Sequence, residues 1–449
     1  MPPNSERVVV ENVQDQRQVS FPHLAYPVMR NAEPRTPQHW IQGKRMQDGA
    51  EGLWRIHDAI YDLTSFAMVH PGGAEWINLT KGTDITEAFE THHLHGVAEG
   101  ELPKYFVKKI STPRNSPFTF QEDGFYKTLK PKVAEKLKEI PLSERKRSNM
   151  MTDLVFLAFI FASSLSCWMM NQSIWIGLAI IPVSGFLLSS LAVSAHNYFH
   201  RRDNWRMYLF DLLGSSYRDW RIMHALSHHL HTNTAQDLEL SAFEPFLMFL
   251  PYMSKSMFEK LASVYWPVIY SFACTVQLGK EVVFSTINHG GKRLNWTNVI
   301  PFLVPTWMWY FGGLPLYWTI PVWLGIMLTA SFFFVMYGIT AGHHAEDNFF
   351  EGDKARAEYI DWGLHQLDTV VERTDYVGNH FKSLTRFGDH FLHHLFPTLD
   401  HGELRHLYPV VLEHCKKFQV ELRTTTFYQA FLTQYKQILR TKPHDFKAK

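Results

Sequence analysis

The histidines are the residues whose types and spacing most clearly predict chemistry in this sequence of 449 residues. Many of the 25 histidines stand in three short clusters instead of being spread evenly. Histidines four positions apart lie on one face of a helix, about 5–6 Å apart at Cβ, which is close enough to bind one metal ion. The clusters are His196 and His200, then His224, His228 and His229, and then His390, His393 and His394. We therefore predict a metal centre built from these imidazoles.

The spacing within the clusters predicts how the ligands divide. We expect His224 and His228 to share a helical face, whereas His229 points about 100° away, where it reaches a second ion. Metal-bound histidines are usually oriented by carboxylates, and Asp219, Asp237 and Asp389 stand close enough in the sequence to do this. Imidazole binds iron, copper, zinc and nickel, so the ligands alone do not name the metal.

A separate pair of histidines indicates a haem. The segment 60–66, Ile-Tyr-Asp-Leu-Thr-Ser-Phe, and the following His70-Pro71-Gly72-Gly73 resemble the cytochrome b5 domain. Pro and two Gly form a tight turn that directs the imidazole and lets the backbone approach a flat ligand. In b5 domains of this kind, the second ligand follows an Asp-x-Thr-x-x-Phe helix, and this sequence has Asp84, Thr86 and Phe89 at those positions. The resemblance implies that this ligand is His93, in preference to His92 or His95.

Two axial histidines leave no open position on the iron, so a haem b held by His70 and His93 is expected to pass electrons and not to bind oxygen. An electron donor in the same chain favours iron at the histidine clusters, because zinc has no redox use for electrons. Between Glu51 and Ile110, nine acidic residues outnumber five basic ones. One face of this domain could therefore guide a basic reductase to the haem, although the same excess also fits ordinary solvated surface.

The elements that must position the clusters are apolar helices. No Asp, Glu, Lys or Arg occurs between Asp153 and Arg201, or from Leu294 to Ala345. A membrane crossing takes roughly 20 helical residues. Each stretch therefore predicts a hairpin of two spans, at about 153–170 and 174–195, and at about 299–317 and 319–341. The alternative, two hairpins buried in a soluble protein, would have to hide long charge-free stretches from water.

Basic residues flank the outer ends of both hairpins, and the turns between the spans are uncharged, which predicts that both termini and all three clusters face the cytosol. The flanking residues are Arg145, Lys146, Arg147, Arg201, Arg202, Arg206, Lys292 and Arg293. A further apolar stretch, Leu261 to Gly279, contains Pro267. Because a single extra crossing would separate the clusters, we interpret it as interfacial or re-entrant.

These features predict a multi-domain protein, with a small α+β cytochrome b5-like haem domain followed by an all-α polytopic membrane domain with four transmembrane helices. The predicted parts are a loosely packed arm (1–48), the haem domain (49–113), a linker with short helices (114–150), the membrane domain (151–420) and a tail (421–449). The net charge of +1 argues against a nucleic-acid partner. Cys167, Cys274 and Cys415 are too few for a disulfide framework, and the N-terminus has no secretory signal.

The three clusters resemble the boxes of the membrane fatty acid desaturase family, which read H-x(3–4)-H, H-x(2–3)-H-H and (H/Q)-x(2–3)-H-H. The resemblance covers most of residues 150–415 besides the haem domain. The segment 393–397, His-His-Leu-Phe-Pro, and Asp361-Trp362 with Gln366, Leu367 and Thr369 are similar to the branch with a fused b5 domain. Within the family, the sequence is most similar to the insect cytochrome b5-related proteins.

This resemblance implies an acyl desaturase with two iron ions, which uses O2 and electrons from NADH-cytochrome b5 reductase. The implied substrate is a fatty acyl chain linked to coenzyme A or phospholipid, and the implied location is the endoplasmic reticulum membrane. The family has a further ligand after the fourth span, where we favour His344 over His343. His231 and His380 are spare candidates, and four others are interpreted as structural: His365, His401, His406 and His414. An acyl channel is expected among Trp307, Trp309, Phe332, Phe333 and Phe334, unless these face lipid.

The boxes also differ from those of the b5-fused branch. Asn197 and Phe199 stand in the first box where that branch has Asp and Gly, the second box has three spacer residues instead of two, and the third begins with His390 instead of Gln. These differences put the position of the double bond in doubt. They also leave open an acyl or sphingolipid hydroxylase on the same site. A third hypothesis is a membrane-anchored haem protein without catalysis.

Overall fold

The N-terminal domain of the computed structural model is built on a small antiparallel sheet. The structure describes residues 19–32, 35–251, 255–289 and 296–446. The sheet has the order β1-β2-β3, with Trp54 paired to Tyr61 and Ala59 to Lys109. Its elements are α1 (Pro37–Gln47), β1 (Trp54–Ile56), β2 (Ala59–Tyr61), α2 (Ala74–Leu79), α3 (Thr86–His92), α4 (Val97–Glu101) and β3 (Phe106–Lys109). This agrees with the predicted α+β domain.

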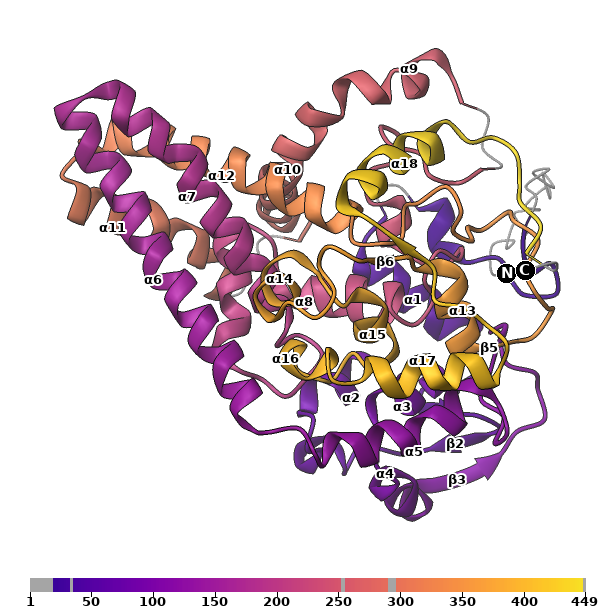
Figure 1. Cartoon of the computed structure of the whole chain (residues 1–449). Helices are drawn as coiled ribbons and strands as arrows, with labels where there is room; N and C mark the ends of the chain where they lie inside the picture. Colours follow the sequence, from indigo (N-terminus) through magenta and orange to yellow (C-terminus); the bar gives the residue numbers. More distant parts are fainter. Residues whose placement is uncertain (1–18, 33–34, 252–254, 290–295, 447–449) are drawn as a thin grey trace, which may run out of the picture.

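Long apolar helices form an arm that extends to the left of Figure 1. Its helices are α6 (Ser143–Gln172), α7 (Ile174–His196), α11 (Leu303–Gly312) and α12 (Leu316–Ile339). At the far tip, the amide of Asn171 donates to the carbonyls of Gly312 and Gly313, each at 3.4 Å. The turns of both hairpins therefore meet at one end of the arm, and the C-terminal ends of α7 and α12 return together to the other end.

The structure does not confirm the count of four spans. Among the described residues, three helices are long and apolar enough to cross a membrane: α6, α7 and α12. The predicted span at 299–317 is instead a 3₁₀ turn at Trp296–Phe302 followed by α11, which ends at Gly313 with a left-handed φ of 65°. The ten residues of α11 extend only about 15 Å, half of a hydrocarbon core. Proline at 301 and 305 and the Gly-Gly pair at 312–313 explain why no longer helix forms.

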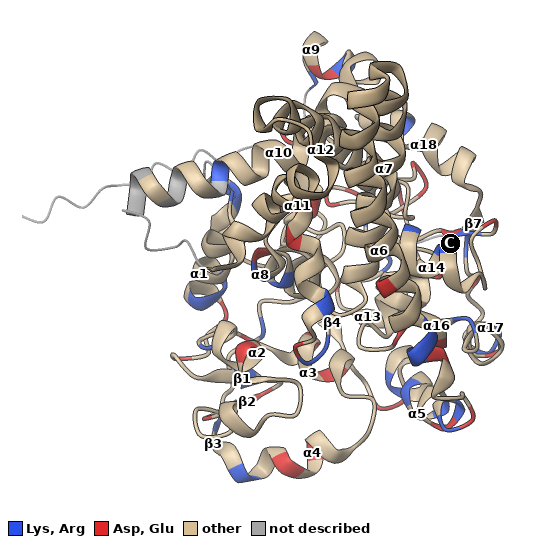
Figure 2. Ribbon diagram, turned by 90° about the vertical axis from the view of Figure 1, so that its left-hand side faces the viewer, with Lys and Arg blue, Asp and Glu red and all other residues tan. Residues whose placement is uncertain are grey.

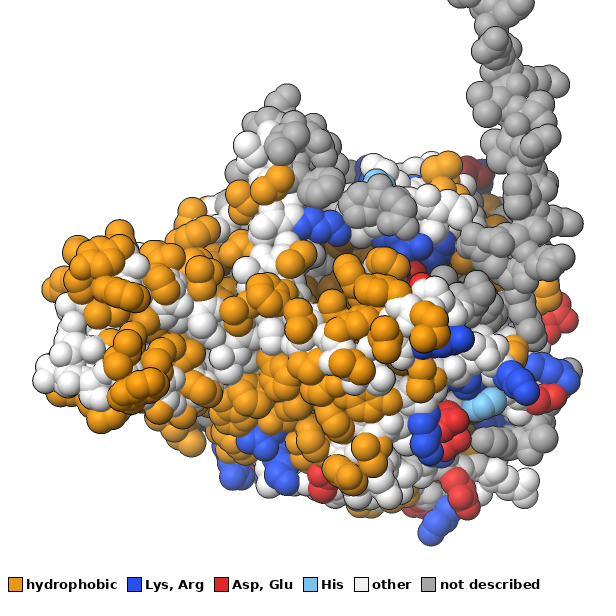
Figure 3. Space-filling view, turned by 90° about the horizontal axis from the view of Figure 1, so that it is seen from above, with side chains coloured by type: hydrophobic (Ala, Val, Ile, Leu, Met, Phe, Trp, Pro, Cys, Tyr) orange, Lys and Arg blue, Asp and Glu red, His pale blue; other side chains and the backbone are white. Residues whose placement is uncertain are grey.

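The surface of the arm is apolar. The helices α7 and α12 of the arm carry no charged residues in Figure 2, and Figure 3 shows hydrophobic side chains spread over the arm and the adjoining face. Exposed members include Leu157, Phe161, Trp175, Tyr310 and Tyr317. An apolar surface of this size does not stay in water. Of the flanking basic residues, Lys292 and Arg293 lie outside the described residues.

The stretch at 261–279 is part of a single helix, α10 (Ala262–His289), which packs against α12. The re-entrant interpretation is therefore wrong, because the chain does not turn back, and Pro267 is accommodated in the first turns. Val264, Val268, Phe272 and Val276 are exposed along one face at helical spacing. This stripe fits a helix that lies against lipid, so the interfacial interpretation stays a prediction.

A helical cap covers the base of the arm. Its elements are β4 (Phe118–Thr119), α5 (Phe125–Leu137), α8 (Tyr217–Trp220), α9 (Met257–Lys260), β5 (Ile360–Asp361), α13 (Trp362–Thr369), β6 (Glu372–Arg373), α14 (His380–Arg386), α15 (His390–Leu395), α16 (His401–Leu404), α17 (Tyr408–Lys417), β7 (Thr424–Thr425) and α18 (Phe427–Leu439). Two short parallel strand pairs, β4-β5 and β6-β7, are added to the expected helices.

The described residues of the segments predicted as arm, linker and tail are packed against the rest of the protein. Arg30 is buried and donates to the carbonyls of Ala235 and Asp237, and the Trp40 indole donates to Gln236. In the linker, α5 is packed against α17 and α13, and β7 joins the tail to the cap. The prediction of a loose arm is wrong for residues 19–48 as far as they are described, because buried arginine and tryptophan groups anchor it. Residues 1–18 of that arm lie outside the described residues.

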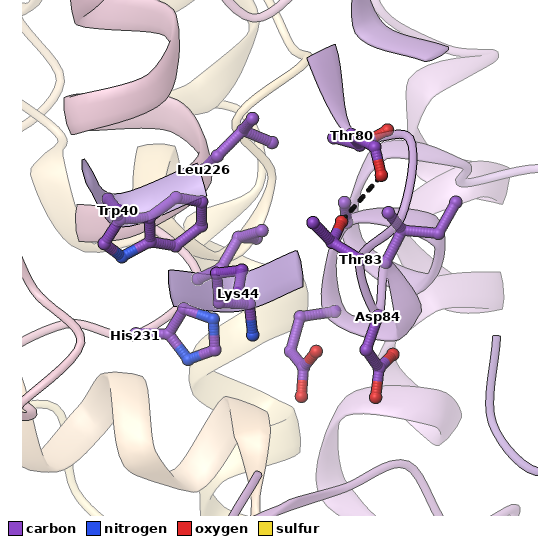
Figure 4. A pocket seen from close by; sticks show the side chains of 11 residues that line it. Trp40, Lys44, Thr80, Thr83, Asp84, Leu226 and His231 are labelled. Carbon is purple, nitrogen blue, oxygen red and sulfur yellow. Dashed lines mark hydrogen bonds between the residues drawn. The ribbon is translucent and has the colours of Figure 1, made fainter. Parts of the chain in front are cut away.

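Ion pairs connect the N-terminal domain to the rest of the chain. Glu75 pairs with Arg218 and Arg221, Arg114 pairs with Asp84 and Glu87, and Lys127 and Lys130 both pair with Glu90. Figure 4 shows how α1 packs within this domain, with Lys44 between Trp40 and the acidic groups and Thr83 bonded to Thr80. Many acidic side chains of the domain are therefore paired with basic side chains of the same chain.

Close helix packing in the arm can be tested at Gly185. A Cβ atom at this position would lie 2.5 Å from the Thr329 Cβ, so α7 and α12 approach each other because glycine is there. We expect Gly185→Leu to reduce the free energy of unfolding by about 1–3 kcal/mol, since the helices must separate. Thermal unfolding in detergent measures this change. Gly338→Ala is the control, because nothing lies within 4 Å of its added Cβ; equal midpoints for both variants would contradict the predicted packing.

Candidate metal and haem sites

Five histidines meet at the end of the arm. They are His196, His200, His224, His229 and His393, all buried. The Nε2 atom of His196 lies 2.6 Å from that of His224, 3.0 Å from that of His393 and 3.4 Å from that of His200. The Nε2 atoms of His229 and His224 lie 2.9 Å apart. We call these five residues the first group.

A second group lies directly beside the first. His228, His343 and His394 bring their ligand atoms within 4.8 Å of one another. The Nε2 atom of His343 is 2.7 Å from that of His390 and 2.8 Å from that of His394, so we include His390. The rings of His229 and His394 stack at 4.0 Å and join the groups. All eight histidines of the three sequence clusters therefore converge.

The local backbone decides which histidine joins which group. Residues Arg221–His228 form a π-helix, in which His229 N–H donates to the carbonyl of His224, five residues back. His224 and His228 share a face as expected, because their rings lie 5.5 Å apart at an interplanar angle of 25°, and with Glu239 they form a third candidate metal group. The π-helix turns less per residue than an α-helix, so His229 also comes toward His224, with 2.9 Å between their Nε2 atoms. We expected His229 to point away and reach a second ion, whereas it lies in the first group with His224.

In several of these histidines, the Nδ1 atom is hydrogen-bonded to a specific acceptor. The Nδ1–H of His224 donates to Glu239 and that of His228 to Asp237, at 2.7 and 2.9 Å. His343 donates to the carbonyl of Thr369, and His394 to the side chain of Gln366. Each of these bonds leaves Nε2 with its lone pair directed into the groups. Asp237 confirms one sequence expectation, whereas Glu239 was missed, although it stands only two residues further along.

The two other proposed carboxylates have different contacts. Asp219 accepts from Gln38, and Asp389 accepts from the Gly378 N–H and the Tyr408 hydroxyl. Asp389 precedes α15 with a left-handed φ of 50°, so it helps to place that helix and not a single imidazole.

The electrostatics suit neutral ligands. Burial, and then the neighbouring imidazoles, hold the pKa values of His229, His393 and His394 well below the usual range. For His228, burial is outweighed by Glu239 and Asp237, which raise its pKa to about 9. Metal binding requires deprotonated imidazole nitrogen. Most of the cluster is therefore ready to bind a cation, and His228 must release a proton to do so.

The spacing of these nitrogens fits metal ligation. Two imidazoles bound side by side at about 2.1 Å from one ion have nitrogens about 3 Å apart, and the separations in both groups lie near this value. The Nδ1 atoms of His196, His200, His390 and His393 are buried without a hydrogen-bond partner. A nitrogen-only ligand set in two adjacent groups fits redox metals such as iron.

The N-terminal domain brings His70 and His93 together as predicted. Their ring centroids lie 6.2 Å apart, which is near the roughly 6 Å expected for two imidazoles on opposite sides of one iron. The Nδ1–H groups donate to the carbonyls of Gly73 and Phe89, so both Nε2 atoms are free. A Cβ at Gly72 would lie 2.8 Å from the His70 ring, which explains the glycine. These residues fit a haem.

Comparison with known proteins agrees with both sites. The fatty acid desaturase family model matches residues 172–426, and the cytochrome b5-like heme/steroid binding domain matches residues 43–111. The chain is 42% identical over 423 residues to the cytochrome b5-related protein of Drosophila melanogaster, covering 93% of this chain and 95% of the relative. The chain belongs to the fatty acid desaturase family. It carries a fused cytochrome b5-like domain, and its family makes it a membrane oxidoreductase.

More distant relatives also match along most of the chain. A probable Delta(5) fatty acid desaturase C of Dictyostelium discoideum is 27% identical over 427 residues, which cover 87% of this chain and 92% of the relative. An acyl-lipid (8-3)-desaturase of Mortierella alpina is 23% identical over 437 residues, covering 87% and 94%. No solved structure matches the chain.

One predicted metal ligand differs from the one that the structure places at the site. His343, and not His344, turns into the second group. His344 donates from Nδ1 to the carbonyl of Ile339, and its ring packs on Phe249 at 4.2 Å. Adjacent residues point in different directions, and Gly342, with a φ of 148°, sets which one faces the site. Sequence spacing does not contain that information.

The remaining histidines are mostly structural, as interpreted. His365 and His414 donate to the carbonyls of Thr232 and Phe125. His401 stacks on His393 at 4.7 Å, and its Nδ1–H donates to Asn197. Asn197, one of the first-box residues that differ from the b5-fused branch, therefore holds His401 against His393, a ligand of the third box. Of the spare candidates, His380 contacts Ser148, and His231 lies beside Trp40 in Figure 4, so neither joins a group.

Of the aromatic residues proposed to line an acyl channel, Phe334 lies nearest to the first group. Its ring contacts Trp220 at 5.5 Å, and Trp220 contacts His224 at 5.2 Å. Trp309 is exposed on the arm, and the Trp307 indole donates to Ser163. The aromatic wall beside the cluster is therefore formed by Trp220, Phe334 and Phe387, which also contacts His196.

His343 and His344 provide a matched test of the ligand set. We expect His343→Ala to lower the ratio of bound metal to haem by about half or more, because it removes the nitrogen that lies beside those of His390 and His394 in the second group. His344→Ala should keep the ratio, since its ring faces Phe249. Metal analysis of the purified proteins measures this, and the haem spectrum should be unchanged in both. Equal metal loss in the two variants would show that the second group is assigned incorrectly.

Proposed function

We propose that this protein is a membrane fatty acid desaturase that introduces a double bond into an acyl chain. The observation that carries this proposal is the convergence of nine imidazoles in two adjacent groups, in a chain that also carries a haem domain. Two ions, one for each group, match this arrangement, and iron suits it because a one-electron donor is part of the same chain.

Bound at these sites, iron supplies an O2-derived oxidant strong enough to remove hydrogen from an unactivated carbon, and haem b supplies electrons singly. The overall reaction balances when one O2, two electrons and two protons convert a CH2–CH2 segment into a double bond and two waters. We propose that the electrons enter from NADH-cytochrome b5 reductase.

The chain itself contributes position and the exclusion of water. Its histidine Nε2 atoms hold the metal ions, and Asp237, Glu239 and Gln366 hold the imidazole rings in the tautomer that binds. Trp220, Phe334 and Phe387 form an apolar wall on the side of the arm, where an acyl chain can leave the bilayer. Buried surroundings prevent the oxidant from being consumed by solvent.

The apolar surface of the arm supports its placement in the lipid bilayer. Both histidine groups then lie on the same side of the bilayer. The turns of the two hairpins meet at the far tip, so the helix ends that carry the ligands emerge together. We propose that this side is the cytosol, that both termini lie there, and that the membrane is the endoplasmic reticulum. The acyl group is linked to coenzyme A or phospholipid.

Lipid profiling tests the proposal. Expression in cells that lack endogenous desaturase activity should produce new unsaturated acyl species with the unaltered protein and none with His394→Ala, whose haem spectrum stays intact. His93→Ala should lose the haem signal, keep its metal and reduce product by at least about tenfold.

The products also separate the rival reaction. Hydroxy acids in place of alkenes would assign the site to a hydroxylase, because the same oxidant can return oxygen to the carbon. If the protein is loaded with metal and haem but changes no lipid in any profile, the proposed activity is wrong.

A further inference from the structure

Two histidines that belong to different domains face each other between the haem site and the first metal group. His92 ends α3, directly before the haem ligand His93, and His200 belongs to the first group. Their ring centroids lie 6.3 Å apart. His92 is not a haem ligand in this geometry, since His93 is the residue that opposes His70. It is therefore the residue of the haem domain that reaches the metal site.

The two rings meet by packing and not by a hydrogen bond. His92 Nδ1 lies 3.1 Å from the carbonyl of Ala88, and His200 Nε2 lies 3.4 Å from that of His196. The nitrogens that remain, His92 Nε2 and His200 Nδ1, are buried without a hydrogen-bond partner. Because the ring centroids lie 6.3 Å apart, these two nitrogens are too far apart to bond each other.

Neighbouring contacts hold the two rings at this distance. The Trp76 ring contacts that of His92 at 6.1 Å, and its indole N–H donates to the carbonyl of Arg201, the residue after His200. The Arg221 guanidinium lies over the Trp76 ring at 4.9 Å and pairs with Glu75. The helices α2 and α3 of the haem domain are thereby attached to the segment that carries His200 and to the start of the π-helix that carries His224.

We propose that His92 is the bridging residue through which each electron passes from the haem ligand His93 to the metal ligand His200, across the packed rings of His92 and His200. Electron tunnelling falls steeply with the gap between groups, so a route through packed side chains is strongly favoured over one through space. This inference rests on the proposed function. In each transfer, the ferrous haem loses one electron and becomes ferric, and the histidine-bound metal centre gains that electron. No bond is made or broken in the chain.

Haem reoxidation measures the transfer directly. The full-length protein, loaded with metal and haem, is reduced without oxygen and then mixed with O2 and acyl substrate in a stopped-flow instrument, while the haem absorption is followed. We expect His92→Ala to slow reoxidation at least tenfold, because it removes the ring that fills the space between His93 and His200. His92→Phe keeps a ring of similar size there and should retain most of the rate.

The controls separate a bridging role from a structural one. Haem spectrum, haem midpoint potential and metal content should match the unaltered protein, and His95→Leu, an exposed position two residues after His93, should reoxidise at the unaltered rate. An unaltered rate in His92→Ala, or equally slow rates in His92→Ala and His92→Phe, would overturn the inference. If the unaltered protein itself shows no more reoxidation than the metal-depleted His343→Ala variant, the proposed function fails as well.

Discussion

Imidazole nitrogens held against one another in a buried space are the constraint on which the rest of this structure depends. The separations of 2.6–3.0 Å between Nε2 atoms place these nitrogens about as far apart as two ligands of one cation. Everything around the histidines serves this requirement: the carboxylates that hold Nδ1–H groups, the buried position that keeps the rings neutral, and the helices that deliver ligands from four separate parts of the chain.

The arm explains why these ligands can converge. A helix end can carry only one or two correctly directed imidazoles, so a nine-histidine site needs several chain segments at one place. The two hairpins supply this, because their turns meet at the tip and their other ends return to the cap together. The ligand segments after α7 and α12 are then completed by the π-helix and by α15 of the cap, each at the same end of the arm.

The haem domain is attached to this site by charge. Glu75, Glu87 and Glu90 face arginine and lysine side chains of the segments around it, several of them buried. Buried ion pairs add little net stability but strongly penalise misplacement, since a shifted domain would leave uncompensated charges. The pairs therefore fix the position in which the haem domain docks. They place α3, with His92 and His93, between the haem site and the first group. The acidic surface that the composition indicated is thus largely an internal interface.

The sequence by itself determined the chemistry of the protein: the histidine spacings, the His-Pro-Gly-Gly turn and the long charge-free stretches predicted the haem domain, the apolar helices and eight metal-site histidines, because these depend on residue type and local periodicity. It did not determine how the ligands divide. The π-helix brings His229 beside His224, the backbone at Gly342 selects His343 over His344, and prolines and glycines shorten the third predicted span. Glu239, Trp76 and His92 gain their roles from neighbours far away in the chain. Those assignments depend on the direction in which each side chain leaves a packed backbone, and only the tertiary structure decides that direction.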